Sequence, residues 1–504
     1  MTGHGNLQQA YVRFVEHLRR QAHLVSVARL LEWDQATCMP PGAFEQRAEQ
    51  AAILARLVHE SATAPDFLDL VDELSERWNE LPAEAQVDVR EVKWRCDRLR
   101  RLPPNFVSER GRLLAMSRAA WSEARERDDF EILRPFLEEV VNREREFASY
   151  VGPDQDPYQV LLEEYEPGAR VTDLDVMFLV LVSHLRGLLK RVGDSSAWMA
   201  ASWPGPFPVA EQHAWNLRLL EWLGFDFHTG RLDQSLHPFS ITVGRDHRIT
   251  TRYDEQDLRE GLFSTLHEAG HALYEQGLDP HLYGLPRGTA CSLGVHESQS
   301  RLWENLIGRR ESFWRFLWPH LRQGFPSLKR MGLDQAVRSV NCVRPSLIRT
   351  EADELTYNLH IVVRFVLERK LIAGELEVDD LPYAWFNEMN VFLGVTPQTS
   401  RDGVLQDVHW ASGAFGYFPT YTLGNLYAAQ LWEALARQVG DIDRLVSRGE
   451  FTPIRQWLQE HVYRWGQTYR PKELIARATG TKPTVDALLR HLEAKVAWIE
   501  AHRG

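Results

Sequence analysis

Helical periodicity dominates the pattern of hydrophobic and polar positions along the chain. Between Glu45 and Glu60, apolar side chains recur at intervals of three and four residues, with charged side chains on the opposite side. This spacing predicts an amphipathic α-helix. Its apolar stripe consists of Ala48, Ala52, Leu54, Ala55 and Val58. Similar stretches lie at 66–80, 108–127, 129–150, 172–192, 209–223, 312–322, 351–372, 424–440 and 483–501. The protein is therefore predicted to be mostly α-helical.

One stretch breaks the helical pattern. From His237 to Asp254, β-branched and polar residues alternate around Gly244, which is typical of a β-hairpin. We expect this hairpin to lie immediately before a helix that ends near Gly277. No repeat, low-complexity tract or linker divides the sequence. Residues 1–504 are therefore expected to form a single, mostly helical domain.

Composition and charge exclude several classes of partner. Of the 504 residues, 44% are hydrophobic and 25% are charged, which is ordinary for a globular protein with a large core. The net charge is -12 and the basic residues are dispersed, so a nucleic-acid partner is not expected. The longest apolar run, Val176 to Val182, is far too short to span a membrane.

The expected compartment is the cytoplasm. The first residues of the sequence lack the apolar core of a signal peptide. The four cysteines are widely spaced and form no CxxC pair, so reduced thiols are the simplest interpretation. They are Cys38, Cys96, Cys291 and Cys342.

The strongest chemical signal is "HEAGHALYEQG", which begins at His267. Residues four apart share one face of a helix, so His267 and His271 can direct their imidazoles at one metal ion. Glu268 lies beside that face, where it can reach a water molecule on the metal and act as a general base. The alternative is that these are two core or surface histidines beside a solvated glutamate.

A catalytic zinc site needs a third protein ligand. "SLGVHESQSRLWENLIGRR", from Ser292 to Arg310, predicts a second helix that offers Glu297. His296, Glu275 and Glu304 are rival candidates, and spacing alone leaves the choice open. Two histidines and a glutamate suit one divalent ion per chain, zinc first, with cobalt or manganese as alternatives.

Further motifs extend from the N-terminal region to the C-terminal third of the chain. They are "WDQATCMPPGAFEQRAEQ" at 33–50, "DPYQVLLEEYEPG" at 156–168, "HPF" at 237–239, "DHRITTRY" at 246–253, "IRTEADELTYNLH" at 348–360 and "GVLQDVHWASGAFGYFPTYTLGN" at 403–425. Together with the HExxH and "HESQSRLWEN" segments, this ordered set resembles the carboxypeptidase Taq family of metal-dependent carboxypeptidases. The resemblance covers nearly the whole chain.

The resemblance implies a mostly α-helical body with a deep central groove and a small antiparallel sheet beside the metal. From the sequence, this helical body is expected to form two lobes that flank the groove. It implies a cytoplasmic homodimer that removes C-terminal residues from peptides with a free C-terminus. His267 and His271 match the metal-binding histidines, Glu268 the catalytic glutamate and Glu297 the third ligand. Arg301 stands where thermolysin-like enzymes often carry a carboxylate that orients a histidine ligand. The residue that performs this task here is not identified by the sequence.

Substrate-binding residues follow from the same motifs. A planar guanidinium suits a terminal carboxylate, and the candidates are Arg248, Arg252, Arg344 and Arg349. Arg349 is preferred because it lies in "IRTEAD", whereas Arg248 has Asp246 nearby as an ion-pair partner. His409, Tyr417 and Tyr421 are candidate donors to an oxyanion, with Tyr417 the more typical of a core residue. The resemblance favours His237 and His409 as groove residues.

Two other functions remain open at this point. An endo-acting oligopeptidase would use the same metal chemistry in a helical cleft. A non-catalytic scaffold with a structural metal would normally close the site with four protein ligands, often including cysteine.

Overall fold

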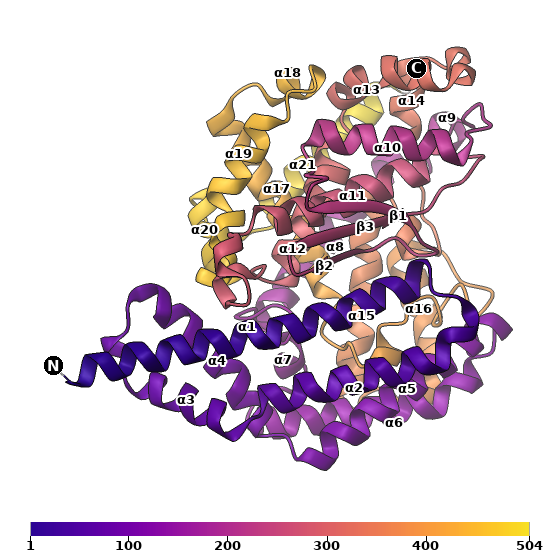
Figure 1. Cartoon of the computed structure of the whole chain (residues 1–504). Helices are drawn as coiled ribbons and strands as arrows, with labels where there is room; N and C mark the ends of the chain where they lie inside the picture. Colours follow the sequence, from indigo (N-terminus) through magenta and orange to yellow (C-terminus); the bar gives the residue numbers. More distant parts are fainter. Residues whose placement is uncertain (1, 503–504) are drawn as a thin grey trace.

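The computed structural model describes residues 2–502, and its helices include every stretch that the periodicity predicts (Figure 1). The predicted stretches correspond to α2 (Phe44–Ala62), α3 (Pro65–Glu76), α5 (Pro104–Arg127), α6 (Phe130–Val151), α8 (Val171–Val192), α10 (Val209–Leu223), α13 (Glu311–Gly324), α15 (Glu354–Ala373), α17 (Pro419–Val439) and α21 (Asp486–Ala501). The mostly helical fold class is thus confirmed.

The remaining helices were not predicted from periodicity, apart from those carrying the candidate metal ligands. They are α1 (Thr2–Thr37), α4 (Ala83–Arg100), α7 (Pro157–Leu162), α9 (Ser196–Met199), α11 (Leu258–Gly277), α12 (Leu293–Arg301), α14 (Leu333–Val340), α16 (Leu381–Leu393), α18 (Ile442–Ser447), α19 (Thr452–His461) and α20 (Pro471–Thr479). Both α11 and α12 lie where the motif analysis expects them. α12 continues directly into a π-helical segment from Leu302 to Ile307.

The predicted hairpin is present as β2 (Ser240–Val243) and β3 (Asp246–Thr251), which are antiparallel. Ser240 pairs with Ile249, and the two strands are joined through Gly244, whose φ of 67° favours glycine. A third strand, β1 (Gly230–Gln234), was not predicted. It pairs in parallel with β3, so the sheet is mixed and has the order β1-β3-β2.

The buried side chains form two clusters. The larger cluster runs from Phe106 to Ile499 and includes the fully buried Trp303 and Trp314. The smaller cluster joins α1, α3 and α4, with Phe14 and Val71 at its centre. Figure 1 shows the N-terminal helices gathered below the sheet, with the rest of the chain above and behind them.

Helix α2 forms as predicted and lies at the surface. None of its residues is buried, although Leu54 and Val58 of the predicted apolar stripe are half-buried. Off that stripe, Phe44 is 60% exposed and Ile53 is 50% exposed. Part of the apolar surface of α2 is therefore exposed.

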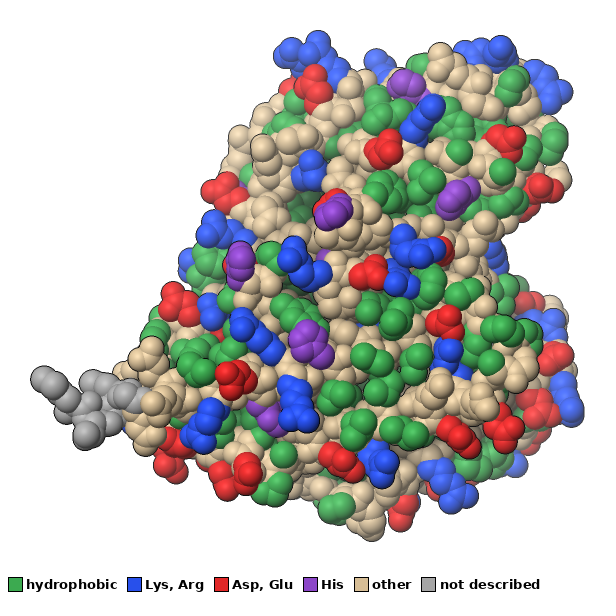
Figure 2. All heavy atoms as spheres, in the orientation of Figure 1, with side chains coloured by type: hydrophobic (Ala, Val, Ile, Leu, Met, Phe, Trp, Pro, Cys, Tyr) green, Lys and Arg blue, Asp and Glu red, His purple; other side chains and the backbone are tan. Residues whose placement is uncertain are grey.

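The sheet and three helices position the candidate metal ligands. Helix α11 packs against β2 and β3 on one side and against α12 on the other, and α12 also packs against α17. A cleft of about 1320 Å³ opens beside these elements and is lined by residues from α11, α12, α15, α17 and α21. No helix among the described residues is long and apolar enough to cross a membrane. Figure 2 shows acidic and basic side chains interspersed over one face of the molecule.

Candidate functional site

Helix α11 carries both histidines on a rigid support. Asp257 caps the helix, since its side chain accepts a hydrogen bond of 2.9 Å from the backbone N–H of Arg259. Leu262, Leu266 and Leu273 are buried and fix the helix against the core. His267 and His271 lie one turn apart, with ring centroids separated by 4.9 Å, and both line the cleft.

Helix α12 brings Glu297 to the histidines because two glycines permit close packing. A Cβ atom at Gly270 of α11 would lie 2.5 Å from the carbonyl oxygen of Gln299. A Cβ atom at Gly424 of α17 would lie 2.5 Å from Cγ of Glu297. Both distances are far below ordinary contact, so α12 can sit between α11 and α17 only because these positions have no side chain.

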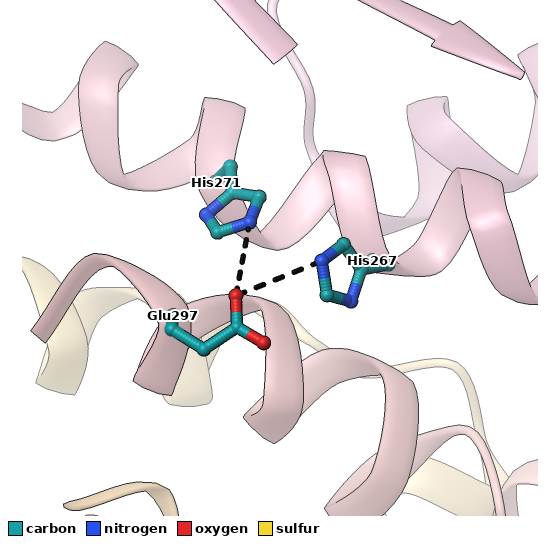
Figure 3. Close-up of side chains that lie close together, drawn as sticks. All are labelled: His267, His271 and Glu297. Atoms are coloured by element: carbon teal, nitrogen blue, oxygen red, sulfur yellow. Dashed lines mark ion pairs between the residues drawn. The ribbon is translucent and has the colours of Figure 1, made fainter. Parts of the chain in front are cut away.

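The three predicted ligands converge (Figure 3). Oε2 of Glu297 lies 3.7 Å from Nε2 of His267 and 3.5 Å from Nε2 of His271. These distances exceed ordinary hydrogen bonds, yet all three donor atoms lie within 4.8 Å of one another. Two imidazole nitrogens and a carboxylate oxygen that face one point in a cleft fit a divalent metal ion.

The rival ligands have other partners. Nε2 of His296 lies 3.0 Å from Oε1 of Glu275, so these two residues form a pair of their own. The His296 ring stacks on the His271 ring at 4.4 Å between centroids. Glu304 contacts the far side of His267, where Oε2 lies 2.8 Å from Nδ1. The geometry therefore favours Glu297 over His296, Glu275 and Glu304.

The charge states also suit a metal. Burial lowers the pKa of His271 to about 3, which keeps this imidazole neutral and able to coordinate. Burial opposes ionisation of Glu297, but Arg301 and the histidines outweigh it and hold the pKa of Glu297 well below its usual range. Burial would lower the pKa of His267, but Glu297 and Glu304 raise it to about 9. A bound metal cation would displace the proton from this imidazole.

Glu304 and Arg301 supply the surroundings that the sequence could not identify. Glu304 accepts a hydrogen bond from Nδ1 of His267 and so directs Nε2 toward Glu297. Arg301 donates from Nε to Oε1 of Glu297 at 2.7 Å and from Nη1 to Oε2 of Glu304 at 3.2 Å. One guanidinium thus fixes both carboxylates. Glu304, three residues after Arg301, supplies the histidine-orienting carboxylate that thermolysin-like enzymes often carry at the place of Arg301.

Glu268, the predicted general base, follows His267 directly on α11. Its side chain lines the cleft beside both histidines and is only 7% exposed. Burial raises the pKa of Glu268 to about 7, while His267 opposes the shift. A carboxylate in this condition can both accept and release a proton near neutral pH.

The comparisons with known proteins agree with this geometry. A family model described as carboxypeptidase Taq (M32) metallopeptidase matches residues 13–496. Over 503 residues, the chain is 43% identical to thermostable carboxypeptidase 1 of Thermus thermophilus, covering 97% of this chain and 99% of that protein. The chain belongs to the carboxypeptidase Taq family. It is therefore a metallopeptidase, and its relatives are named as carboxypeptidases.

Other members of the family are similar in sequence and structure. Carboxypeptidase 1 of Bacillus subtilis is 39% identical and is aligned over 96% of this chain and 97% of its own length. The crystal structure of the M32 carboxypeptidase from Deinococcus radiodurans matches with a TM-score of 0.94 at 39% identity, covering 98% of this chain and all of that one. Metallocarboxypeptidase 1 of Trypanosoma cruzi gives a TM-score of 0.94 at 33% identity.

Arg349, the predicted carboxylate-binding residue of this family member, lies in a buried charge cluster. Asp407 accepts hydrogen bonds from Nη2 of Arg349 at 2.8 Å and from Nε of Arg364 at 2.7 Å. Although burial opposes it, the two guanidinium groups hold the pKa of Asp407 well below its usual range. Within this trio, two positive charges face one negative charge, and only Arg349 of the two arginines lines the cleft.

The other arginine candidates are placed differently. Arg248 pairs with Asp246 at 2.5 Å, as the sequence suggests, and stacks over Trp33. Arg252 lines the cleft but forms an ion pair with Glu260. Arg344 also lines the cleft and is exposed. Arg349 is therefore the candidate with the most restrained guanidinium.

His409 and Tyr421 form a pair near Arg349. Nε2 of His409 lies 3.2 Å from the Tyr421 hydroxyl, and the Arg349 guanidinium lies 4.8 Å from the Tyr421 ring centroid. Burial lowers the pKa of His409 to about 4 and raises the pKa of Tyr417 to about 12. Tyr421, Tyr417 and the exposed His237 all line the cleft.

The sequence analysis missed Tyr357, which lines the cleft, and Asp407, which pairs with Arg349. Tyr357 accepts a hydrogen bond of 3.1 Å from Nη1 of Arg349. Both lie within motifs quoted above, so their motifs were signals, but their contact partners lie up to 58 positions away. Long-range contacts of this kind cannot be read from local spacing.

Proposed function

We propose that this metallopeptidase releases amino acids one at a time from the free C-terminus of peptides. The observation that carries the proposal is one cleft that combines three converging metal ligands, a buried carboxylate beside them and a restrained arginine. The first two features serve peptide-bond hydrolysis. The third suits a terminal carboxylate.

His267, His271 and Glu297 are proposed to hold one divalent metal ion, with zinc as the first choice and cobalt or manganese as alternatives. When bound, such an ion acidifies water and polarises the scissile carbonyl. Glu304 fixes the orientation of His267, and Arg301 fixes that of Glu297. Each contact leaves a single donor atom directed at the same point.

Glu268 is proposed to be the general base. Its carboxylate takes the proton of the attacking water and delivers it to the leaving amine. The near-neutral pKa that burial gives Glu268 supports both transfers. Its neighbours on α11 hold it at the cleft wall, where a peptide can approach.

Tyr421, which lines the cleft, is proposed to face the oxyanion that forms on the scissile carbonyl, with His409 as its hydrogen-bonding partner. Burial keeps the Tyr421 hydroxyl protonated by raising its pKa well above the usual value, so it is a donor at neutral pH. His409 lies within reach of that hydroxyl and orients it. His237, on the segment before β2, is proposed to contact the peptide further along the cleft.

Arg349 is proposed to bind the terminal carboxylate. Asp407 restrains the guanidinium but leaves the trio with one surplus positive charge. A peptide carboxylate supplies the missing negative charge, and the paired interaction is strong because the site is largely shielded from water.

A time-resolved digest tests the proposal. A metal-loaded sample is mixed with a peptide of about ten residues, and the products are followed by mass spectrometry. The account predicts a ladder that shortens from the C-terminus by one residue at a time, with Glu268→Gln as the inactive control. An initial cut at an internal bond would favour an endo-acting oligopeptidase, and no cleavage at full metal occupancy would favour a scaffold.

The enzyme is further proposed to act in the cytoplasm as a homodimer. The four cysteines are free, which suits a reducing compartment. The family resemblance supports a dimer, and the exposed apolar side chains of α2 offer a surface for a second copy. Light scattering at micromolar concentration, with Ile53→Glu as the disrupting variant, tests the assembly.

A further inference from the structure

Tyr357 of α15 contacts both Arg301, beside the predicted metal ligands, and Arg349, the predicted carboxylate-binding residue. The side chain is only 5% exposed, and it lies between two arginines that come from different parts of the chain. Arg301 lies on the ring face, and Arg349 donates to the phenol oxygen. Among the residues that the structure describes, Tyr357 alone stacks against or hydrogen-bonds with both guanidinium groups.

The first contact leads to the metal ligands. The Arg301 guanidinium lies 4.2 Å from the centroid of the Tyr357 ring, an arrangement in which the aromatic face attracts the cation. The Arg301 side chain is only 12% exposed and donates to both Glu297 and Glu304. The Tyr357 ring therefore packs against Arg301, and Arg301 in turn fixes Glu297.

The second contact leads to the carboxylate-binding residue. Nη1 of Arg349 donates to the Tyr357 hydroxyl at 3.1 Å, while the opposite edge of the guanidinium is held by Asp407. The Tyr421 ring meets the Tyr357 ring nearly at right angles, at 85° and 6.3 Å between centroids. Arg349 is therefore fixed in its plane by two hydrogen-bonding partners on different elements.

An exopeptidase must hold the terminal carboxylate at a fixed separation from the attacking group, because the scissile bond is one residue from that carboxylate. We infer that Tyr357 is the positioning residue that sets this separation, by holding Arg349 through its hydroxyl and the Arg301–Glu297 pair through its ring. The part of this inference that concerns Arg349 rests on the proposed function. The part that concerns Arg301 predicts metal affinity and does not depend on the substrate.

Two substitutions separate the halves. Tyr357→Phe removes the hydroxyl but keeps the ring, so it should loosen Arg349 alone. The KM for a free-acid peptide should rise about tenfold, with kcat changed less than threefold, because a charged donor loses its partner. The KM for the amidated peptide should not change, so the preference for the free acid falls by the same factor. Metal affinity should stay within twofold of wild type.

Tyr357→Leu removes the ring as well. Arg301 then loses the surface that supports it, and the metal dissociation constant, measured by competition with a chromophoric chelator, should rise roughly tenfold. Arg301→Lys, which keeps the charge but not the planar donor group, should weaken metal binding in the same way if the Leu variant does not fold. Tyr253→Phe is the matched control, since that hydroxyl contacts His213 and lies outside the cleft lining.

The outcomes are distinguishable. Wild-type peptide preference in Tyr357→Phe, or wild-type metal affinity in both Tyr357→Leu and Arg301→Lys, overturns the inference. A purely structural role would lower the melting temperature and the rates on both peptides together, without changing their ratio. If wild type itself cleaves both peptides equally, the proposed function fails, and the metal-affinity comparison still decides the Arg301 half.

Discussion

Gly424 offers the clearest test of how α12 packs against α17. Replacement by alanine would place a Cβ atom 2.5 Å from Cγ and 2.7 Å from Cβ of Glu297. Carbon atoms normally approach to about 3.5–4.0 Å, so roughly 1 Å of overlap must be relieved by moving Glu297 or by separating α12 from α17. Metal sites tolerate displacements of only about 0.2 Å in ligand distance.

Gly424→Ala should therefore weaken metal binding by roughly tenfold to a hundredfold, the range found when the surroundings of a metal site are disturbed. Overpacking should also lower the free energy of unfolding by about 1–3 kcal/mol. Gly187→Ala in α8 is the matched control, because no heavy atom lies within 4 Å of its added Cβ. That control should keep its metal affinity and gain about 0.5–1 kcal/mol of stability.

The assay is chelator competition on apo protein, with a thermal melt of each variant. A folded Gly424→Ala protein that binds zinc as tightly as wild type would show that the glycine does not determine the position of Glu297. The same reasoning would then fail for Gly270.

Three further predictions concern the carboxylates. Glu268→Gln should retain the metal and lose about a hundredfold to ten-thousandfold in kcat, because it cannot accept a proton; near-normal turnover at full occupancy would remove Glu268 from the mechanism. Glu297→Ala should lose metal after dialysis, whereas Glu304→Gln should retain it with an affinity reduced about tenfold; equal retention by both variants would contradict the ligand assignment. Glu368 is a buried residue of α15 that accepts hydrogen bonds from Tyr158 and Trp410. Burial raises its pKa to about 7, so the stability that its neutral form supports is present below its unfolded pKa and is lost as pH rises through 7. Denaturant titrations should show Glu368→Gln gaining on the order of 3 kcal/mol relative to wild type between pH 5 and pH 8, and a pH-independent difference would count against this.

Local spacing predicts many of the helices and the two histidines of the candidate metal site. Amphipathic stretches give ten helices, and the i, i+4 relation between His267 and His271 holds in α11. Strand β1 was missed because only Leu232 of its five residues is buried, so no alternation marks it.

The rest of the site depends on contacts between distant segments. Spacing favoured Glu297 only slightly over His296, Glu275 and Glu304, and the resemblance then supported that choice. The role of Glu304 depends on the π-helical segment that follows α12, a conformation that periodicity does not predict. The Arg349–Asp407 pair joins residues 58 positions apart, so no local pattern contains it.

The most direct test of the carboxypeptidase account compares one peptide as its free acid and as its amide, cleaved by wild type and by Arg349→Ala. A charge-assisted hydrogen bond contributes about 1.5–3 kcal/mol, so wild type should cleave the free acid at least roughly tenfold faster in kcat/KM. In Arg349→Ala the free-acid rate should fall to the amide rate with metal content unchanged, since the two changes remove halves of one contact. Equal cleavage of both peptides by wild type would contradict the account, and a preference that survives in Arg349→Ala would show that another residue binds the carboxylate.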